Sequence, residues 1–359
     1  MKIVVTAGGT GGHIFPALAT IQKIKELDSS TELLWITTLR SNEAQLAQEF
    51  EVPFRSLAVE GIRRRISLQP IRALLKFAWA LGAMMKTITP QKCDAVIAYG
   101  GYVCGPVVMA AKLRRVPIYL HEQNSVPGAV NRFFATKAQR VFLGMPLADG
   151  WSLGGETRVV GTPVRPIDTE ALKNYTFDTS IDTNRTTIFI CGGSQGAMSM
   201  NRVLFEAVDW MVSQGLQVIW QTGEPGLEEV SLHYKDQDLV HPLASIDQMY
   251  PYYNLATIVI GRAGASTISE AALFAKPSLF IPLPWSAENH QWFNAGFAED
   301  AGWAKRIEQN EQSSARIIEE VTHMLFDTQK CYQQMQAAAQ KSGVHSAAQT
   351  IAEEVLHYD

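Results

Sequence analysis

The chain of 359 residues is 47% hydrophobic and 18% charged, a composition that excludes an intrinsically disordered protein and, at this length, favours two domains of similar size. The formal net charge of −4 divides unevenly, because residues 1–165 carry 20 Lys and Arg against 11 Asp and Glu (+9), whereas residues 166–359 carry 11 against 24 (−13). The basic first half favours an anionic partner, such as a phosphate-bearing ligand, acidic lipid or nucleic acid.

The cysteines and the apolar runs indicate in which cellular compartment the protein is expected. The four cysteines show neither the C-x-x-C spacing of zinc sites nor a dense disulfide framework, so we expect a reducing compartment. The N-terminus opens directly into an apolar strand without a secretory signal pattern, and we therefore expect no export. The best apolar stretch, Ala73 to Met85, contains Lys76 and is shorter than the roughly 18–20 residues that span a bilayer.

Short apolar runs alternate with longer helical patterns, which is typical of βαβ units and of a parallel sheet covered on both faces. Both halves begin alike, at residues 3–11 and 188–196, with a strand, two glycines, a short polar turn and a helical pattern. The sequence therefore predicts an α/β protein of two Rossmann-like domains that face a cleft, the default ligand site. The expected strands are Lys2–Ala7, Leu33–Ile36, Ala95–Ala98, Ile118–His121, Thr187–Cys191, Gln217–Gln221, Thr257–Ile260 and Ser278–Ile281.

The domain boundary is predicted near residues 161–166, where Pro163 and Pro166 oppose the continuation of a helix. The last segment, about Ala347 to His357, is helical by pattern and is compatible with packing on either domain. Since chains of this organisation often cross back, we assign residues 1–165 and a C-terminal helix, about 344–359, to one domain. Residues 166–343 form the other.

The first strand leads into a glycine-rich turn, Gly8-Gly9-Thr10-Gly11-Gly12, followed by His13. Glycines let the backbone approach a ligand closely and direct amides at an anion. The spacing matches neither the dinucleotide fingerprint nor a P-loop. A tight turn that needs glycine for geometry alone explains two of these glycines better than four. His13 is a candidate general base or, alternatively, a polar residue at a helix start.

The stretch from Arg55 to Lys92 holds eight basic residues against one acidic residue, Glu60. Aromatic and aliphatic residues are interleaved with them, as in an amphipathic helix that lies in an anionic membrane surface. The alternative is a core helix with a cationic flank, and nucleic acid is disfavoured because no reading motif is present. The candidate membrane-contacting residues are Arg63, Arg64, Arg65, Phe77 and Trp79.

Two further segments of the first half place polar side chains after strands, where α/β proteins concentrate their chemistry. One carries Tyr102, and the other carries His121, Glu122 and Asn124. We interpret Asn124 as a reader of hydroxyl groups. Glu122 is a candidate catalytic carboxylate or, with His121, a buried pair that orients the loop.

In the second half, a small-residue turn opens a helix after the strand at 257–260. Its free amides and helix dipole would stabilise a diphosphate, and Glu270 would then hold ribose hydroxyls. The alternative is a capping box, because Thr267 and Glu270 have the required spacing. With Ser194 at the matching turn of the same half, the nucleotide interpretation is favoured. Gln291 and Asn294 are amides of the type that reads sugar hydroxyls, or else helix-surface polarity.

These segments together resemble the MurG family of bacterial N-acetylglucosaminyltransferases over nearly the whole chain. Each glycine turn alone is weakly diagnostic, whereas six motifs in the family's order are highly specific. Thr162 departs from the family, which more often has Asn before Pro-Val-Arg. The matching motifs are Gly9-Thr10-Gly11-Gly12-His13, Gly100-Gly101-Tyr102-Val103-x-Gly105-Pro106, His121-Glu122-Gln123-Asn124, Pro163-Val164-Arg165, Gly192-Gly193-Ser194-Gln195-Gly196 and Arg262-Ala263-Gly264-Ala265-x-Thr267-Ile268-Ser269-Glu270.

The resemblance implies a GT-B fold and an inverting transfer in peptidoglycan precursor synthesis. The C4 hydroxyl of a polyprenyl-pyrophosphate-linked muramyl-pentapeptide attacks C1 of UDP-N-acetylglucosamine and displaces UDP. The implied location is peripheral, at the cytoplasmic face of the bacterial inner membrane. The implied enzyme needs no cofactor and holds no resident metal, and the sequence leaves the metal dependence of the reaction open.

The resemblance also assigns residues to the two substrates. The acceptor pyrophosphate and reacting hydroxyl fall to Thr10, Gly11, Gly12 and His13, with Tyr102 nearby. The resemblance assigns the uracil to Arg165 and Ile246, the ribose to Glu270, and the transferred sugar to Gln291 with Asn124. It assigns the diphosphate to Ser194 and to the backbone of Ala265, Ser266 and Thr267. Ile268, Ser269 and Asn294 are further candidate substrate-binding residues.

Three alternatives compete with this interpretation. A nucleotide-dependent oxidoreductase needs the dinucleotide glycine spacing, and a sugar-binding protein would usually have an export signal; the sequence lacks both. Another UDP-N-acetylglucosamine enzyme of the same fold, such as a 2-epimerase, is the nearest rival. A 2-epimerase would have no use for a basic, Trp-bearing surface.

Overall fold

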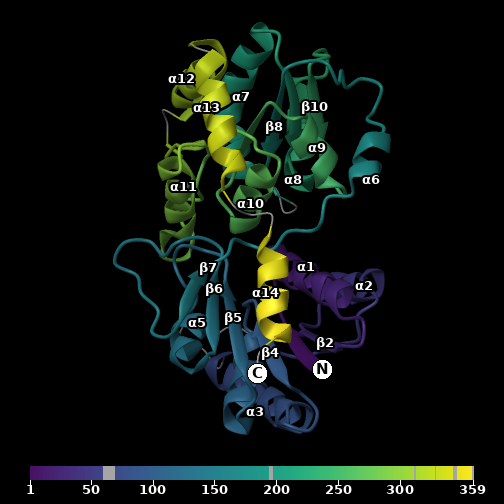
Figure 1. Cartoon of the computed structure of the whole chain (residues 1–359). Coiled ribbons are helices and arrows are strands. Elements are labelled where there is room, and N and C mark those ends of the chain that lie inside the picture. The colour runs from purple at the N-terminus through teal and green to yellow at the C-terminus, as the bar shows by residue number, and fades with distance from the viewer. Residues whose placement is uncertain (60–68, 194–196, 311–312, 328, 343–345, 358–359) are drawn as a thin grey trace. The chain divides into compact units, whose positions relative to one another are not determined.

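The computed structural model describes residues 1–59, 69–193, 197–310, 313–327, 329–342 and 346–357 (Figure 1). Two compact units divide the chain. One comprises Met1–Arg165 with Gly343–Asp359, and the other comprises Pro166–Ser342.

The first unit is built on a seven-stranded parallel sheet in the order β3-β2-β1-β4-β5-β6-β7. Its strands are β1 (Lys2–Thr6), β2 (Glu32–Thr37), β3 (Phe54–Ser56), β4 (Ala95–Ala98), β5 (Ile118–Glu122), β6 (Arg140–Leu143) and β7 (Thr157–Val159). Its helices are α1 (Gly11–Leu27), α2 (Ser41–Glu49), α3 (Gln69–Thr87), α4 (Cys104–Arg114), α5 (Ala129–Phe134), the short η1 (Ala135–Lys137) and α14 (Ala347–Leu356).

The second unit repeats the arrangement with six parallel strands in the order β10-β9-β8-β11-β12-β13. Its strands are β8 (Thr187–Cys191), β9 (Gln217–Gln221), β10 (Val240–Leu243), β11 (Ile258–Gly261), β12 (Ser278–Phe280) and β13 (Ala304–Arg306). Its helices are α6 (Thr169–Asn174), α7 (Met198–Ser213), α8 (Glu224–His233), α9 (Met249–Leu255), α10 (Ala265–Leu273), η2 (Ala287–Asn289), α11 (His290–Asp300), α12 (Ser313–Thr322), η3 (His323–Asp327) and α13 (Gln329–Gln340).

Alternation along the central strands explains why helices cover both faces of each sheet. In β1, Ile3 and Val5 pack in a core cluster with α1, whereas Val4 packs in a second cluster with residues of α3 and α4. Successive strand residues point to opposite faces, so an unbroken apolar run needs cover on both sides. This arrangement confirms the predicted α/β class with two Rossmann-like units.

Each sheet reverses its strand order at one place, between β1 and β4 in the first unit and between β8 and β11 in the second. In doubly wound sheets, ligands bind beyond the carboxyl ends of the strands at such a switch point. The strands at both switch points run directly into glycine-containing turns, at residues 8–9, 100–101, 192–193 and 261–264. The topology therefore places the sequence motifs where ligands are expected.

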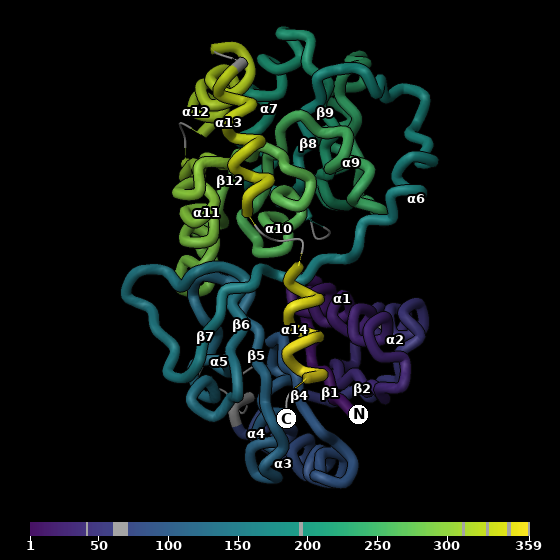
Figure 2. Tube along the Cα trace, in the orientation of Figure 1, coloured from purple at the N-terminus to yellow at the C-terminus, as the bar shows by residue number. Residues whose placement is uncertain are grey.

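The C-terminal helix α14 packs on α1 of the first unit (Figure 2). Ile351, Ala352 and Val355 are fully buried in the core cluster that contains α1. The Glu354 carboxylate lies 2.6 Å from Arg140 Nε and 3.1 Å from an Arg158 nitrogen, which ties α14 to β6 and β7. The predicted helix is confirmed, and its apolar and ionic contacts hold it on the first unit.

All eight predicted strands are confirmed, with ends that differ by at most one residue. Sequence reasoning missed β3, β6, β7, β10 and β13. Four of these are edge strands, β3 and β7 in one sheet and β10 and β13 in the other. Edge strands are short and lack the continuous apolar run of a strand buried on both faces.

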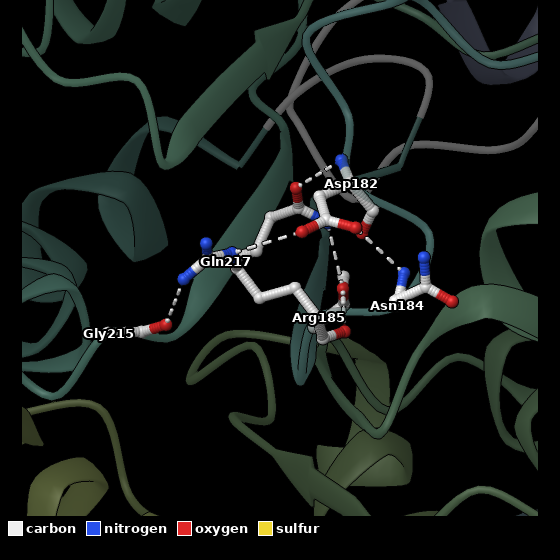
Figure 3. Close-up of polar contacts among 6 residues, drawn as sticks. Asp182, Asn184, Arg185, Gly215 and Gln217 are labelled. Atoms are coloured by element: carbon white, nitrogen blue, oxygen red, sulfur yellow. Dashed lines mark hydrogen bonds and ion pairs between the residues drawn. The ribbon is translucent and has the colours of Figure 1, made fainter.

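A polar cluster closes the amino-terminal ends of β8 and β9, away from the switch-point turns (Figure 3). The backbone amide of Asp182 donates to Gln217 Oε1 at 2.9 Å, and Gln217 Nε2 donates to the Asp182 carbonyl at 3.2 Å. Arg185 donates to the carbonyl of Gly215 at 3.2 Å. Since these groups satisfy one another, we interpret the cluster as structural.

Candidate functional site

In the first unit, the turns after β1 and β4 touch through their backbones. A Cβ added to Gly101 would lie 2.3 Å from the carbonyl oxygen of Gly8, and Gly101 has a φ of +86°. Only glycine combines this close approach with a left-handed backbone. The two turns therefore form one continuous backbone surface beside the switch point.

His13 lies in the first turn of α1 and is oriented by both turns. Its Nδ1 is 3.1 Å from Thr10 Oγ1. A Cβ on Gly100 would lie 2.7 Å from His13 Cδ2, so the absent side chain makes room for the imidazole. Thr10 makes no side-chain cap to α1, and first-turn amides have no partners within a helix. The amides of Gly11 and Gly12 are thus suited to an anion beside a titratable side chain.

Glu122 is buried, and its carboxylate accepts hydrogen bonds from its own loop and from α5. Its carboxylate accepts hydrogen bonds from both the backbone and side-chain nitrogens of Asn124, at 3.1 and 3.2 Å. It also accepts from the Gly128 amide and from Asn131 Nδ2, both at 2.8 Å. These contacts orient the loop and Asn124 and favour the structural alternative for Glu122, while its catalytic role stays a prediction.

His121 takes no part in the predicted pair with Glu122. Its Nε2 lies 3.1 Å from the carbonyl of Gly161, and its ring stacks on Tyr99 at 5.2 Å between centroids. Burial lowers the pKa of His121 to about 4, so the imidazole is neutral near pH 7. In contrast, Tyr102 in the neighbouring turn is 68% exposed and accessible to a ligand.

The start of helix α10 in the second unit decides between the capping box and the phosphate site. Helix α10 begins at Ala265, and its N-cap is Gly264, which has no side chain to form a capping hydrogen bond. Thr267 is therefore the third helical residue, whereas a capping box would need it at the N-cap. The capping alternative is wrong, and the uncapped first turn of α10 has the amides and the dipole that a phosphate requires.

The residues of α10 differ in what they can offer a ligand. Ala265, Ile268 and Ser269 are buried, so only their backbone is available, whereas Ser266 and Thr267 are half-buried. Glu270 is half-buried one turn into the helix. Its carboxylate lies near the phenol of Tyr253. Burial is the main reason that the pKa of Tyr253 is raised well above its usual value, and the neighbouring Cys191 and Glu270 raise it further.

Three polar side chains around α10 form hydrogen bonds with backbone groups. Asn294 is fully buried and donates to the carbonyl of Ala263 at 3.2 Å, so it supports the turn, and its predicted contact with the sugar stays a prediction. Gln291 Oε1 accepts from the amide of Leu283 at 2.9 Å. Arg262 donates to Ser199 Oγ at 2.9 Å and to two carbonyls of the loop after β12. Burial lowers the pKa of Arg262 to about 10, so it remains charged at neutral pH.

The two residues predicted to contact the uracil belong to different units, Arg165 to the first and Ile246 to the second. Arg165 is half-buried, with its guanidinium 4.2 Å from the centroid of the Phe15 ring, a cation–π geometry. Ile246 is half-buried in the irregular segment after β10. The prediction for Ser194 falls outside the described residues, as do those for Arg63, Arg64 and Arg65.

Helix α3 carries apolar residues on two faces. Ala73, Ala80 and Met84 are buried, and Phe77 is half-buried against α4, where a Cβ on Gly105 would lie 3.1 Å from its ring. The opposite face exposes Ile71, Leu74, Leu75 and Trp79 by 60–66%, at the i, i+3, i+4, i+8 spacing of one helix face. The exposed face therefore includes Trp79 and excludes Phe77.

Sequence analysis did not identify three residues that contribute to the exposed apolar surface or to the glycine-rich turn. Leu113 at the end of α4 is 56% exposed and Phe133 in α5 is 64% exposed. Glu43 of α2 accepts a hydrogen bond from the amide of Gly9. No motif signals any of them, because each depends on which helices the fold brings together.

Among the described residues, no three His, Cys, Asp or Glu side chains are grouped so that they could hold a metal ion. No helix within the described ranges is long and apolar enough to cross a membrane.

Comparison with known proteins identifies relatives over the full length. Residues 3–143 match the glycosyltransferase family 28 N-terminal domain, and residues 187–351 match its C-terminal domain. The UDP-N-acetylglucosamine–N-acetylmuramyl-(pentapeptide) pyrophosphoryl-undecaprenol N-acetylglucosamine transferase of Bacillus pumilus is 32% identical, over 97% of this chain and 96% of its own.

Among solved structures, MurG of Acinetobacter baumannii superposes with a TM-score of 0.76 at 27% identity, covering 99% of both chains. The UDP-GlcNAc 2-epimerase of Neisseria meningitidis superposes with a TM-score of 0.72 at 16% identity, covering all of both chains. At that identity, the epimerase likeness shows a shared fold only. These matches confirm the predicted GT-B fold.

Proposed function

Because the chain belongs to the MurG transferases of glycosyltransferase family 28, we propose that it moves N-acetylglucosamine from UDP-N-acetylglucosamine to an undecaprenyl-pyrophosphoryl N-acetylmuramyl-pentapeptide. The observation that carries the proposal is the 32% identity to such a transferase across 97% of the chain. The reaction would convert lipid I into lipid II in peptidoglycan synthesis.

The chemistry of the first unit suits the acceptor. In the proposed step, the C4 hydroxyl of the muramyl sugar forms a bond to C1 of the donor sugar while the bond from C1 to the UDP oxygen breaks. His13 takes the hydroxyl proton, and the amides of Gly11 and Gly12 bind the acceptor pyrophosphate. The orientation of His13 by Thr10 and Gly100 supports this role.

The chemistry of the second unit suits the donor. The uncapped first turn of α10 would stabilise the negative charge that develops on the departing diphosphate. We assign Glu270 to the ribose, Arg165 and Ile246 to the uracil, and Gln291 to the transferred sugar. The proposed reaction uses no cofactor.

Acceptor dependence separates this function from its nearest rival. The enzyme should release UDP from UDP-N-acetylglucosamine only when the lipid acceptor is present, and the sugar should appear in the lipid product. Release of UDP without acceptor, together with formation of the 2-epimer, would establish an epimerase instead.

We also propose that the first unit docks on an anionic membrane surface through α3. The exposed face of α3, defined by Ile71, Leu74, Leu75 and Trp79, has no counterpart in an ordinary core helix. Helix α4 packs on α3, and its terminal Arg114 donates to the carbonyl of Met85. Leu113 and Phe133, with nearby cations, extend the same apolar and basic character onto α4 and α5.

Vesicle co-sedimentation tests the docking surface. Trp79→Ser should reduce binding to anionic vesicles, and binding of the wild type should fall with added salt. Trp285→Ser is a matched control, because Trp285 of the second unit is 68% exposed against 66% for Trp79. Equal binding losses in both variants, or equal binding to neutral vesicles, would reject α3 as the docking surface.

A further inference from the structure

A buried carboxylate supports the glycine-rich turn of the first unit. Glu43 lies in α2 and its side chain is completely buried, 0% exposed. Carboxylates are almost never fully buried unless they are paired or hydrogen-bonded. Neither the sequence motifs nor the family assignment gave Glu43 a role.

The Glu43 carboxylate joins three segments. Oε2 accepts from the hydroxyl of Thr37, at the end of β2, and from the amide and hydroxyl of Thr38, both at 2.7 Å. Oε1 accepts from the amide of Gly9 at 2.9 Å. Burial alone raises the pKa of Glu43, but the hydrogen bonds from Thr37, Thr38 and Gly9 outweigh it and hold the pKa below its usual value.

Gly9 is held on both sides. Its carbonyl accepts a hydrogen bond from Arg40, the residue before α2, while its amide donates to Glu43. Gly9 has a φ of +92°, and a Cβ at this position would meet no atom within 4 Å. These two hydrogen bonds hold the left-handed turn at a position where an added Cβ would meet open space.

The hydrogen bonds to Gly9 also affect the position of Thr10 and, through it, of His13. Gly9 precedes Thr10, whose hydroxyl lies 3.1 Å from His13 Nδ1. Because Glu43 occupies the Gly9 amide, the amides left for an anion begin beyond Gly9, next to His13. A shift of Gly9 would move both the anion-binding amides and the hydroxyl that orients the imidazole.

We propose that Glu43 is a positioning residue that sets the glycine-rich turn for the acceptor pyrophosphate and holds His13 in register with the reacting hydroxyl. The inference rests on the proposed function, because it concerns the acceptor side of the same reaction. Glu43 touches neither substrate, and its effect passes through Gly9 and Thr10.

Glu43→Gln is the sharpest test. With its single carbonyl oxygen kept at the three donors of Thr37 and Thr38, the glutamine turns its NH2 group toward the Gly9 amide, so donor faces donor. We expect kcat/KM for the lipid acceptor to fall about tenfold to a hundredfold, the usual effect of losing a hydrogen bond to a charged group. The Kd for UDP should stay within about twofold, since the proposed donor residues lie elsewhere.

Glu49→Gln is the matched control, because Glu49 lies on the same helix, carries the same charge and is exposed. Arg40→Ala is the second variant; it releases the carbonyl of Gly9 from an exposed position, where folding is not at risk. It should lower acceptor kcat/KM without changing UDP affinity. If Glu43→Gln fails to fold, Arg40→Ala decides the question.

The proposal is overturned if Glu43→Gln matches Glu49→Gln in acceptor kcat/KM, or if UDP affinity falls in parallel with it, as for a purely structural residue. An unchanged acceptor kcat/KM in Arg40→Ala would also overturn it. Failure of the proposed function is distinguishable, because then the wild-type enzyme would form no lipid product.

Discussion

The two units place glycine turns at equivalent switch points but support them differently. In the first unit, the turn after β1 is held by the side chains of Glu43 and Arg40 and leads to the titratable His13. In the second unit, the turn after β11 leads into α10, whose first residues, Ala265, Ser266 and Thr267, do not titrate. Its support, Asn294, holds the turn through a backbone carbonyl.

The proposed function accounts for this difference, because the two turns would serve the two halves of a glycosyl transfer. An acceptor hydroxyl must lose a proton, so its site needs a base whose orientation is controlled. A departing diphosphate needs only stabilisation of negative charge, which amides and a helix dipole supply. Under this proposal, the same strand–turn–helix element would serve two tasks, depending on the side chains that surround it.

Removal of His13 should produce the largest effect on catalysis. We expect His13→Ala to reduce turnover by roughly two to four orders of magnitude, the range for a lost general base, with UDP affinity unchanged. Steady-state kinetics with the lipid acceptor and calorimetry with UDP measure the two quantities. Near-normal turnover would remove His13 from the chemistry and erase the distinction between the two turns.

The backbone contact in the first unit can be tested with a pair of glycine substitutions. Gly9 and Gly101 both have positive φ, but only Gly101 would bring a Cβ into contact with backbone. We expect Gly9→Ala to lower the free energy of unfolding by about 1 kcal/mol and Gly101→Ala by about 2–4 kcal/mol. Urea unfolding of both variants provides the comparison, and equal losses would argue that the turns do not touch.

Mild acid should weaken the first unit. The pKa of His121 is about 4 in the folded chain against an ordinary 6.5, so below pH 6.5 the unfolded state binds a proton that the folded state does not. Stability is therefore lost as pH falls from 6.5 toward 4, and about 2 kcal/mol is gone by pH 5.

Hydrogen exchange of peptides from β5, measured at pH 7 and pH 5 with correction for the intrinsic rate, reports this loss. His121→Gln keeps a donor for the Gly161 carbonyl and should flatten the pH dependence. His241 of the second unit, whose pKa is also lowered by burial, acts in the same direction. An unchanged slope in His121→Gln would assign the acid sensitivity to other groups.

On the donor side, the expected effect is smallest. Glu270→Ala should weaken UDP binding about tenfold, the value of one hydrogen bond to a charged group. It should cost less stability than the roughly 1 kcal/mol of a lost cap, since Gly264 and not Thr267 is the N-cap. Calorimetry and a melting curve separate these outcomes, and a lowered melting temperature with intact UDP affinity would contradict the ribose assignment.

Sequence predicted the parts of this molecule that depend on local pattern. Central strands and glycine turns are visible because burial on both faces and positive φ leave compositional signatures. The roles of single polar residues were harder to predict. Sequence left open whether Glu122 and Asn294 face a ligand, and in the structure both hydrogen-bond to backbone groups. Glu43 was missed because its partners lie in β2 and in the turn after β1. Whether a polar side chain faces inward depends on tertiary packing, which no local spacing encodes.

Hydrogen exchange of the wild-type enzyme tests most directly whether the turn after β1 binds the acceptor and the turn before α10 binds the donor. UDP should protect amides in peptides covering residues 262–272 and leave those covering residues 8–14 at their free rates. A soluble, short-chain pyrophosphate acceptor should do the reverse. Protection of residues 8–14 by UDP, with residues 262–272 unaffected, would contradict the assignment of the first turn to the acceptor and of the second to the donor.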